Sequence, residues 1–180
     1  MAIAKAKLTE EEFMRLPDDG RKYELVDGEA KEVPAGFQHA AIVANIIALF
    51  MPYARGRDIL AASQAGFRMV DGNIRSPDVS FTLKSRLPQG RPNKGFGNLA
   101  PDLCIEIISD SEDRADMERK VGEYFTAGAQ QVWHLFPETQ TARVFTAPAA
   151  FTDYAPTDTL DGGDLLPGFR CRVAELFALE

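Results

Sequence analysis

The chain has 180 residues, of which 45% are hydrophobic and 26% charged, as expected of one globular domain spanning residues 1–180. Its formal net charge of −7 opposes tight binding to nucleic acid in general, because phosphate groups repel an acidic surface. The two cysteines have no partners at metal-ligand spacing, and the sequence has neither a secretion signal nor a run of about 18 apolar residues, so we expect a cytoplasmic protein without a disulfide framework, a structural zinc site or a membrane partner.

The first third of the chain predicts a short helix, a hairpin and a long helix. Thr9-Glu10-Glu11-Glu12 has the capping-box pattern that starts a helix. Two β-type runs within 23–33 flank Asp27-Gly28, a dipeptide that favours the positive φ angles of a tight hairpin turn. Between 39 and 53 apolar residues recur three and four positions apart, which predicts a helix with a broad buried face.

A second antiparallel pair is predicted at 58–70 and 73–83, with its turn at Asp71-Gly72. The stretch 84–100 that follows is rich in Pro, Gly, Lys and Arg and contains no acidic residue. We expect a mobile loop there, because long connections more often carry function than packing.

The remainder of the chain predicts a strand, a crossover helix and further strands. The β-type run 101–108 precedes N-cap candidates between Ser109 and Asp113 and an apolar stripe that predicts a helix ending at Gly128. Later elements are expected as strands at 131–136 and 142–145 and a short helix at 173–179. Strands on both sides of a crossover helix, with hairpins elsewhere, predict a mixed α/β sheet with helices on both faces.

Glu106 is the most informative residue, because it places one carboxylate inside an otherwise apolar strand. Burying an ionised carboxylate among Ile and Leu side chains costs several kcal/mol, as a rough estimate, unless a cation, a metal or hydrogen bonds compensate it. The strand is therefore a candidate functional site.

Asp78, Glu106 and Lys120 would form a site if the strand ends and the following helix start converge. Two carboxylates and a backbone carbonyl, that of Ile107, are oxygen ligands that suit Mg²⁺ or Mn²⁺ and leave positions for water and a phosphate oxygen. The metal would lower the pKa of bound water, and a nearby lysine could orient or deprotonate that water or stabilise negative charge. These are the roles that phosphodiester hydrolysis needs.

Several segments correspond in order and content to a known family. They are Tyr23-Glu24-Leu25-Val26-Asp27-Gly28-Glu29, Ser76-Pro77-Asp78-Val79, Pro101-Asp102-Leu103-Cys104-Ile105-Glu106-Ile107-Ile108-Ser109, Lys120 with Tyr124, Gly128 and Trp133. From about Leu8 to Phe177 the chain resembles the Uma family of restriction-endonuclease-like proteins. The resemblance implies the PD-(D/E)XK nuclease fold, a mixed α/β (α+β) sheet flanked by helices with metal ligands on two neighbouring strands.

The resemblance also assigns roles to individual residues. Asp78 matches the aspartate of the Pro-Asp motif, Glu106 the second acidic ligand and Glu24 an additional acidic residue. The standard pattern has its lysine two residues after the second acid, where this chain has Ile108. The resemblance places the lysine on the next helix, at Lys120, and helical spacing puts Lys120 at the edge of the buried face.

Glu106 and Asp78 also have structural interpretations. Glu106 could be neutralised by a salt bridge to Arg75 or Lys120, and Asp78 could cap a turn, as Asp often does after Pro. Lys120 itself could be a solvated charge on its helix.

Glu24 and His39 have structural interpretations as well. Glu24 could pair with the neighbouring Arg21 or Lys22. His39, at the start of a predicted helix, could bind phosphate or metal, but a capping or surface role is favoured.

The leading hypothesis is a divalent-metal-dependent endonuclease that acts on DNA, with Mg²⁺ or Mn²⁺ as the cofactor. The residues expected to contact the DNA backbone are Lys84, Arg86, Arg91 and Lys94. A homodimer is expected, because a two-fold axis lets one site per chain cut each strand of a duplex. The alternatives are a catalytically silent nuclease-fold module that binds nucleic acid or protein, and a purely structural domain.

Overall fold

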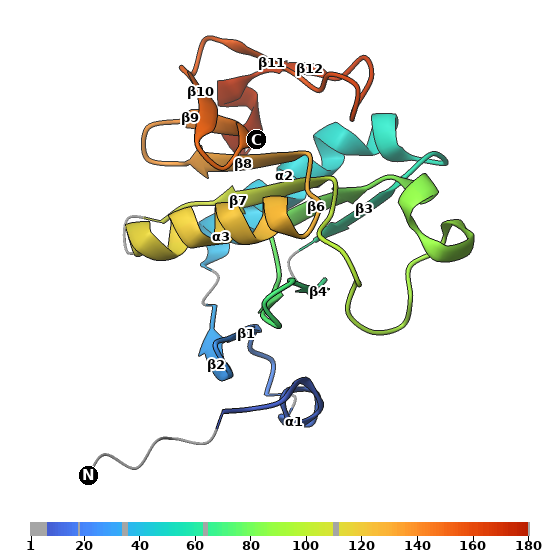
Figure 1. Cartoon of the computed structure of the whole chain (residues 1–180). Helices are drawn as coiled ribbons and strands as arrows, with labels where there is room; N and C mark the ends of the chain where they lie inside the picture. The colour runs from blue at the N-terminus through green and yellow to red at the C-terminus, as the bar shows by residue number, and fades with distance from the viewer. Residues whose placement is uncertain (1–6, 18, 34–35, 63–64, 110–111, 180) are drawn as a thin grey trace.

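The computed structural model describes residues 7–17, 19–33, 36–62, 65–109 and 112–179. A six-stranded sheet with the order β10-β9-β8-β7-β6-β3 lies at its centre (Figure 1). Its strands are β3 (Ile59–Ala62), β6 (Val79–Thr82), β7 (Leu103–Ile107), β8 (Gln131–Phe136), β9 (Thr141–Ala147) and β10 (Ala150–Tyr154). β7 and β8 run parallel and the other pairs are antiparallel, so the sheet is mixed, as predicted.

The two faces of this sheet carry different helices because side chains alternate along β7. Ile105 and Ile107 pack in one core cluster with α2 (Phe37–Ala54), which covers one face. Cys104 packs with α3 (Arg114–Thr126) in a second cluster, on the other face. Asp113 is the observed N-cap of α3, whereas Asp110 and Ser111, also candidates, lie outside the described residues.

α2 has the length and the apolar content of a membrane-spanning helix. Its buried residues are Ile42, Val43, Ile46, Phe50 and Ala54, and all of them belong to the core cluster beneath the sheet. A helix that is buried against strands in a protein core can be as apolar as a membrane-spanning helix. The composition of α2 alone therefore does not distinguish a core helix from a membrane span.

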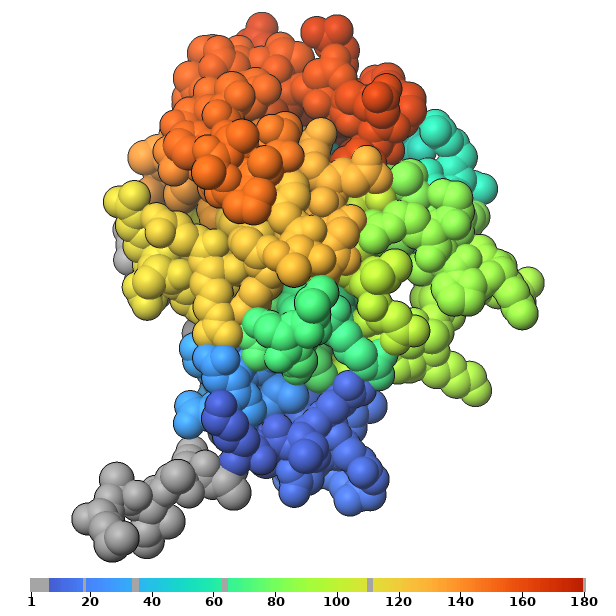
Figure 2. Space-filling view, in the orientation of Figure 1, coloured from blue at the N-terminus to red at the C-terminus, as the bar shows by residue number. Residues whose placement is uncertain are grey.

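A smaller four-stranded sheet, in the order β2-β1-β5-β4, lies beside the large one. Its strands are β1 (Tyr23–Val26), β2 (Glu29–Glu32), β4 (Phe67–Arg68) and β5 (Ile74–Arg75). α1 (Glu10–Met14) starts at the predicted capping box of Thr9 and shares a small core with this sheet. In Figure 2 the blue N-terminal segment, which carries α1, β1 and β2, forms the lower part of the molecule, below the green and yellow segments.

The predicted pair 58–70 and 73–83 is divided between the two sheets. β3 pairs with β6 in the large sheet, and β4 pairs with β5 in the small one. Pro77 explains the division, because it has no N–H to continue a ladder between β5 and β6. Asp78 therefore lies where the chain passes from one sheet to the other.

The remaining elements connect or cover the sheets. They are the 3₁₀ turns η1 (Lys84–Arg86) and η2 (Pro88–Gly90), the strands β11 (Thr159–Asp161) and β12 (Arg170–Arg172), and η3 (Val173–Phe177). The short C-terminal helix expected at 173–179 is thus a 3₁₀ helix, and its buried Val173, Leu176 and Phe177 close the core over α2.

Candidate metal and catalytic site

Asp78 and Glu106 face each other across neighbouring strands. The antiparallel register of β6 and β7 pairs Val79 with Ile105, and one further step puts Asp78 opposite Glu106. Both side chains are buried. The two carboxylates that the sequence singled out are therefore brought together at one end of these strands.

Basic side chains from two other segments of the chain contact Asp78. His39 Nε2, on the first turn of α2, lies 3.0 Å from Asp78 Oδ1, and Lys22 Nζ lies 3.5 Å from the same oxygen. The other carboxylate oxygen, Oδ2, accepts a hydrogen bond from the Ile107 backbone N–H at 2.9 Å. Burial tends to raise the pKa of Asp78, but the His39 hydrogen bond and the Lys22 charge hold it below its ordinary value.

Glu106 is less well compensated than Asp78. Tyr124 Oη donates a hydrogen bond to Glu106 Oε1 at 2.5 Å, and Lys120 Nζ lies 3.8 Å from that oxygen. Burial raises the pKa of Glu106 to about 7; the Lys120 charge opposes this rise, and the negative charges of Asp78 and Glu24 add to it. A carboxylate with this pKa would gain from an added cation.

Lys120 lies between two carboxylates. Its Nζ is 3.7 Å from Glu24 Oε2 and 3.8 Å from Glu106 Oε1, with little of the side chain exposed. Burial favours the neutral amine, but the charges of Glu106 and Glu24 outweigh it and raise the pKa of Lys120 above its ordinary value. The structure thus places Lys120 beside both acids from its position on α3.

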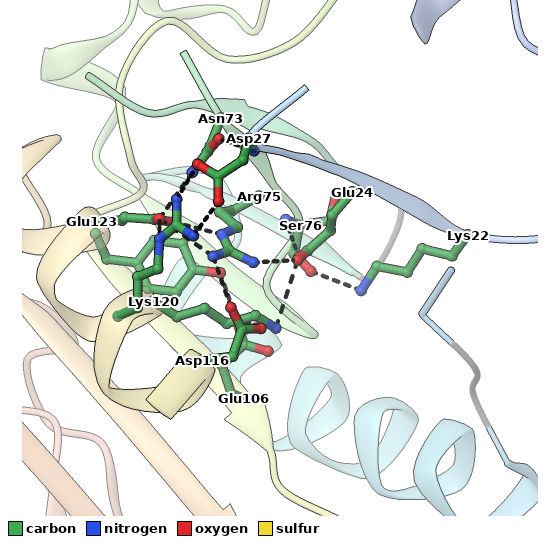
Figure 3. A network of polar contacts seen from close by, with 12 residues as sticks. Lys22, Glu24, Asp27, Asn73, Arg75, Ser76, Glu106, Asp116, Lys120 and Glu123 are labelled. Carbon is green, nitrogen blue, oxygen red and sulfur yellow. Dashed lines mark hydrogen bonds and ion pairs between the residues drawn. The ribbon is translucent and has the colours of Figure 1, made fainter. Parts of the chain in front are cut away.

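Glu24 reaches the same place from β1. Its Oε1 accepts a hydrogen bond from the Ser76 N–H at 2.9 Å, two residues before Asp78, and its Oε2 lies 3.0 Å from Arg75 Nη1 (Figure 3). The alternative interpretation, in which Glu24 pairs with Arg21 or Lys22, is therefore wrong. Arg21 pairs with acidic residues at the surface instead.

The donors at this site fit a hard divalent cation. Asp78, Glu106 and the carbonyl of Ile107 offer oxygen atoms only, as Mg²⁺ and Mn²⁺ prefer. The described residues contain no group of three or more His, Cys, Asp or Glu side chains arranged as metal ligands. A two-carboxylate site of this kind would need the backbone carbonyl and water to complete its coordination, which is usual for Mg²⁺.

The basic stretch, residues 84–100, does not lie beside Asp78 and Glu106. Asp78 precedes β6 and Lys84 follows it, so the length of that strand, roughly 13 Å, separates them. Lys84 Nζ donates to the Gly56 carbonyl and Arg86 pairs with the buried Asp102, so both serve packing. Arg91 and Lys94 are exposed, on the loop that projects from the sheet at the right of Figure 1.

His39, Lys22 and Arg75 have different partners from those suggested by the sequence. The capping or surface role favoured for His39 is wrong, because Gly36 is the N-cap of α2 and the imidazole contacts Asp78. Arg75 contacts other acids than Glu106. The alternation of β1 was an available signal for Lys22, since it stands two residues before Glu24 and so on the same face.

Comparison with known proteins agrees with this architecture. The crystal structure of a putative nuclease belonging to DUF820 from Anabaena variabilis ATCC 29413 matches with a TM-score of 0.81, covering 94% of this chain and 97% of that one at 20% sequence identity. This match confirms the restriction-endonuclease-like α/β fold. No curated protein matches the chain. The family described as "Uma2: Putative restriction endonuclease" matches residues 10–174, and the chain therefore belongs to the Uma2 family.

Proposed function

We propose that this protein is a Mg²⁺- or Mn²⁺-dependent endonuclease that hydrolyses DNA phosphodiester bonds. The observation that carries the proposal is the juxtaposition of Asp78 and Glu106 with Lys120 Nζ 3.8 Å from Glu106. Membership in the Uma2 family, which is described as "Putative restriction endonuclease", supports nucleic acid as the substrate. Acidic ligands beside a lysine are the groups that metal-assisted hydrolysis of a phosphodiester requires.

Each residue has a role that follows from its position. Asp78, Glu106 and the Ile107 carbonyl would hold the cation, which when bound activates water and offsets phosphate charge. The raised pKa of Lys120 keeps it protonated, so it acts as a hydrogen-bond donor to the attacking water or to a phosphate oxygen and not as a base. Glu24 supports Lys120 from the side opposite Glu106.

Contacts to the DNA backbone are proposed for the exposed Arg91 and Lys94 of the basic stretch, whereas Lys84 and Arg86 are engaged in internal contacts. A homodimer remains a proposal drawn from the symmetry of duplex cleavage. The cytoplasmic location remains a prediction from the sequence.

The test combines calorimetric titration of Mn²⁺ with cleavage of supercoiled plasmid. Wild type should bind Mn²⁺ and nick plasmid, and Asp78→Asn and Glu106→Gln should lose both while keeping the wild-type circular dichroism spectrum. The matched control is Asp161→Asn, which removes an exposed carboxylate far along the chain. An unchanged Mn²⁺ affinity in Glu106→Gln would contradict the assignment of the ligand.

One observation favours a second function, a catalytically silent module that binds nucleic acid or protein. His39 Nε2 and Lys22 Nζ lie 3.0 and 3.5 Å from Asp78, and Lys120 Nζ lies 3.8 Å from Glu106, so both carboxylates have basic side chains beside them. A module of this kind would retain DNA binding in the presence of EDTA and show no cleavage with Mg²⁺ or Mn²⁺.

A further inference from the structure

Arg75 is a fully buried cation at the centre of an acidic network. Its Nη1 lies 3.0 Å from Glu24 Oε2, its Nε 2.5 Å from Glu123 Oε2 and its Nη2 3.2 Å from Asp116 Oδ1 (Figure 3). Neither Asp78 nor Glu106 is among its ion-pair partners in the part of the chain that the structure describes. Arg75 therefore touches the groups that surround Lys120, and not the candidate metal ligands.

The two acids that Arg75 holds on α3 flank Lys120 along the helix. Asp116 stands four residues before Lys120 and Glu123 three residues after it, which puts all three on one face of α3. The third acid, Glu24, is itself 3.7 Å from Lys120 Nζ. One guanidinium thus fixes both the helix that carries the lysine and the carboxylate that the lysine contacts.

Glu24 extends this arrangement to the candidate metal ligands. Its second oxygen accepts from the Ser76 N–H, at the start of the Ser76-Pro77-Asp78 passage between the sheets. Register places Glu24 opposite Arg75, because β1 and β5 pair at Leu25 and Ile74. The fork of Arg75 is suited to this task, since a planar guanidinium contacts several carboxylates in fixed directions and an ammonium does not.

We propose that Arg75 is a positioning residue of the nuclease site, which sets the place of the Lys120 ammonium between Glu24 and Glu106. The stability of the fold alone does not explain a buried guanidinium with three acidic partners. Well-packed apolar residues can often replace buried ion pairs without lowering the free energy of unfolding. The proposal rests on the proposed function for its catalytic consequence, but the position of Lys120 can be measured without activity.

Arg119 supplies a matched control, because it joins the same parts of the molecule without touching Glu24. It makes a bidentate ion pair with Asp27, at the β1–β2 turn, and contacts Glu123 at 2.7 Å. It is also partly exposed. Loss of Arg119 therefore weakens the attachment of α3 to the small sheet but leaves the Arg75–Glu24 contact in place.

The experiment compares Arg75→Lys, Asp116→Asn and Arg119→Gln in the full chain. In Arg75→Lys we expect kcat to fall by about 100-fold, because misplacing a catalytic group by about 1 Å can cost that much. KM and Mn²⁺ affinity should stay within about two-fold of wild type. Asp116→Asn, which removes one partly exposed arm of the network and should fold normally, should lower kcat less. Arg119→Gln should leave kcat within about two-fold of wild type, because it does not touch Glu24.

Crystal structures of the same variants separate this proposal from the proposed function. In Arg75→Lys, Lys120 Nζ should leave its position near Glu24 and Glu106, and in Arg119→Gln it should stay. An unmoved Lys120 in Arg75→Lys would overturn the positioning role, as would equal losses of kcat in Arg75→Lys and Arg119→Gln. If Arg75→Lys does not fold, an unmoved Lys120 with unchanged kcat in Asp116→Asn would overturn it. A wild type that neither binds Mn²⁺ nor cleaves DNA would overturn the nuclease function alone.

Discussion

Tyr124 donates its hydroxyl hydrogen to Glu106 at 2.5 Å from a fully buried position on α3. The contact ties the acidic strand to the same helix that carries Lys120. It also gives the buried carboxylate of Glu106 a hydrogen bond that favours its ionised form.

We expect Tyr124→Phe to destabilise the protein by about 1–3 kcal/mol, because the carboxylate loses its buried donor. Mn²⁺ affinity at pH 7 should fall several-fold, since the ionised form of Glu106 becomes less favourable. Urea unfolding and calorimetry measure the two effects. Tyr23→Phe, which removes an exposed hydrogen bond to Asp19, is the control and should change neither quantity. If Tyr124→Phe is as stable as wild type and binds Mn²⁺ equally well, the hydroxyl contact contributes neither to stability nor to metal affinity.

Lys120→Met should reduce plasmid cleavage by about 100- to 1000-fold, the range observed when one preorganised donor to a developing negative charge is removed. Mn²⁺ binding should persist, because Lys120 is not a ligand and its removal takes a competing cation away from Glu106. Single-turnover cleavage with saturating Mn²⁺ measures the effect. If Lys120→Met cleaves as fast as wild type, Lys120 has no catalytic role.

Much of the site could be predicted from the sequence because its strongest signals are local. A carboxylate in the apolar strand that holds Glu106 and the Pro-Asp turn at Asp78 are visible within a few residues. Lys120 was assigned by the family resemblance, and helical spacing added only that it lies at the edge of the buried face. The pairing of β6 with β7 then brings Asp78 and Glu106 together. The same holds for the hairpin at Asp27-Gly28 and for α2.

The acidic partners of Arg75, His39 and Lys22 could not be predicted, because those partners are distant in the chain. The contact of Lys120 with Glu106 was, by contrast, among the interpretations of the sequence. Arg75 meets Glu123 across 48 positions and Lys22 meets Asp78 across 56. Apart from the two-residue spacing of Lys22 and Glu24, no local feature of the sequence distinguishes a basic residue that will be buried against an acid from one that will be solvated. The division of 58–83 between two sheets was missed for a related reason. Pro77 is visible in the sequence, but the pairing of β3 with β6 and of β4 with β5 is not.

His134 is a buried imidazole on β8, beside Glu106 in the parallel register of β7 and β8. Its Nε2 has no hydrogen-bond partner among the described residues. Burial, together with the charges of Lys120 and Arg143, lowers the pKa of His134 to about 4. The imidazole is therefore neutral in the folded protein at neutral pH.

His134 should make the protein less stable in acid. The unfolded chain binds a proton at an ordinary pKa of 6.5, whereas the folded chain does so only near 4, so stability is fully present above about pH 6.5 and is lost as the pH falls toward 4. The contribution is about 3 kcal/mol across that window. Urea unfolding of wild type and His134→Gln between pH 4 and 7 measures it, and the difference between the two curves should become constant above pH 7. Parallel curves throughout would show that His134 titrates normally.

Glu106 should act in the opposite direction over nearly the same window. Its folded-state pKa of about 7 lies above the ordinary 4.5, so the folded protein keeps a proton that the unfolded chain has released, and stability falls as the pH rises from about 4.5 to 7. The loss is about 3 kcal/mol in metal-free protein, and Glu106→Gln should abolish it.

Because the effects of Glu106 and His134 have opposite signs, the stability of wild type should depend only weakly on pH in this range. The variant that lacks one of these two groups should show the pH dependence caused by the other. Urea unfolding in EDTA at pH 5 and pH 7.5 tests this: Glu106→Gln should gain stability relative to wild type as the pH rises. If that relative gain is absent, Glu106 is already ionised near its ordinary pKa, and the strand carries a compensated carboxylate instead of one that gains from a metal ion.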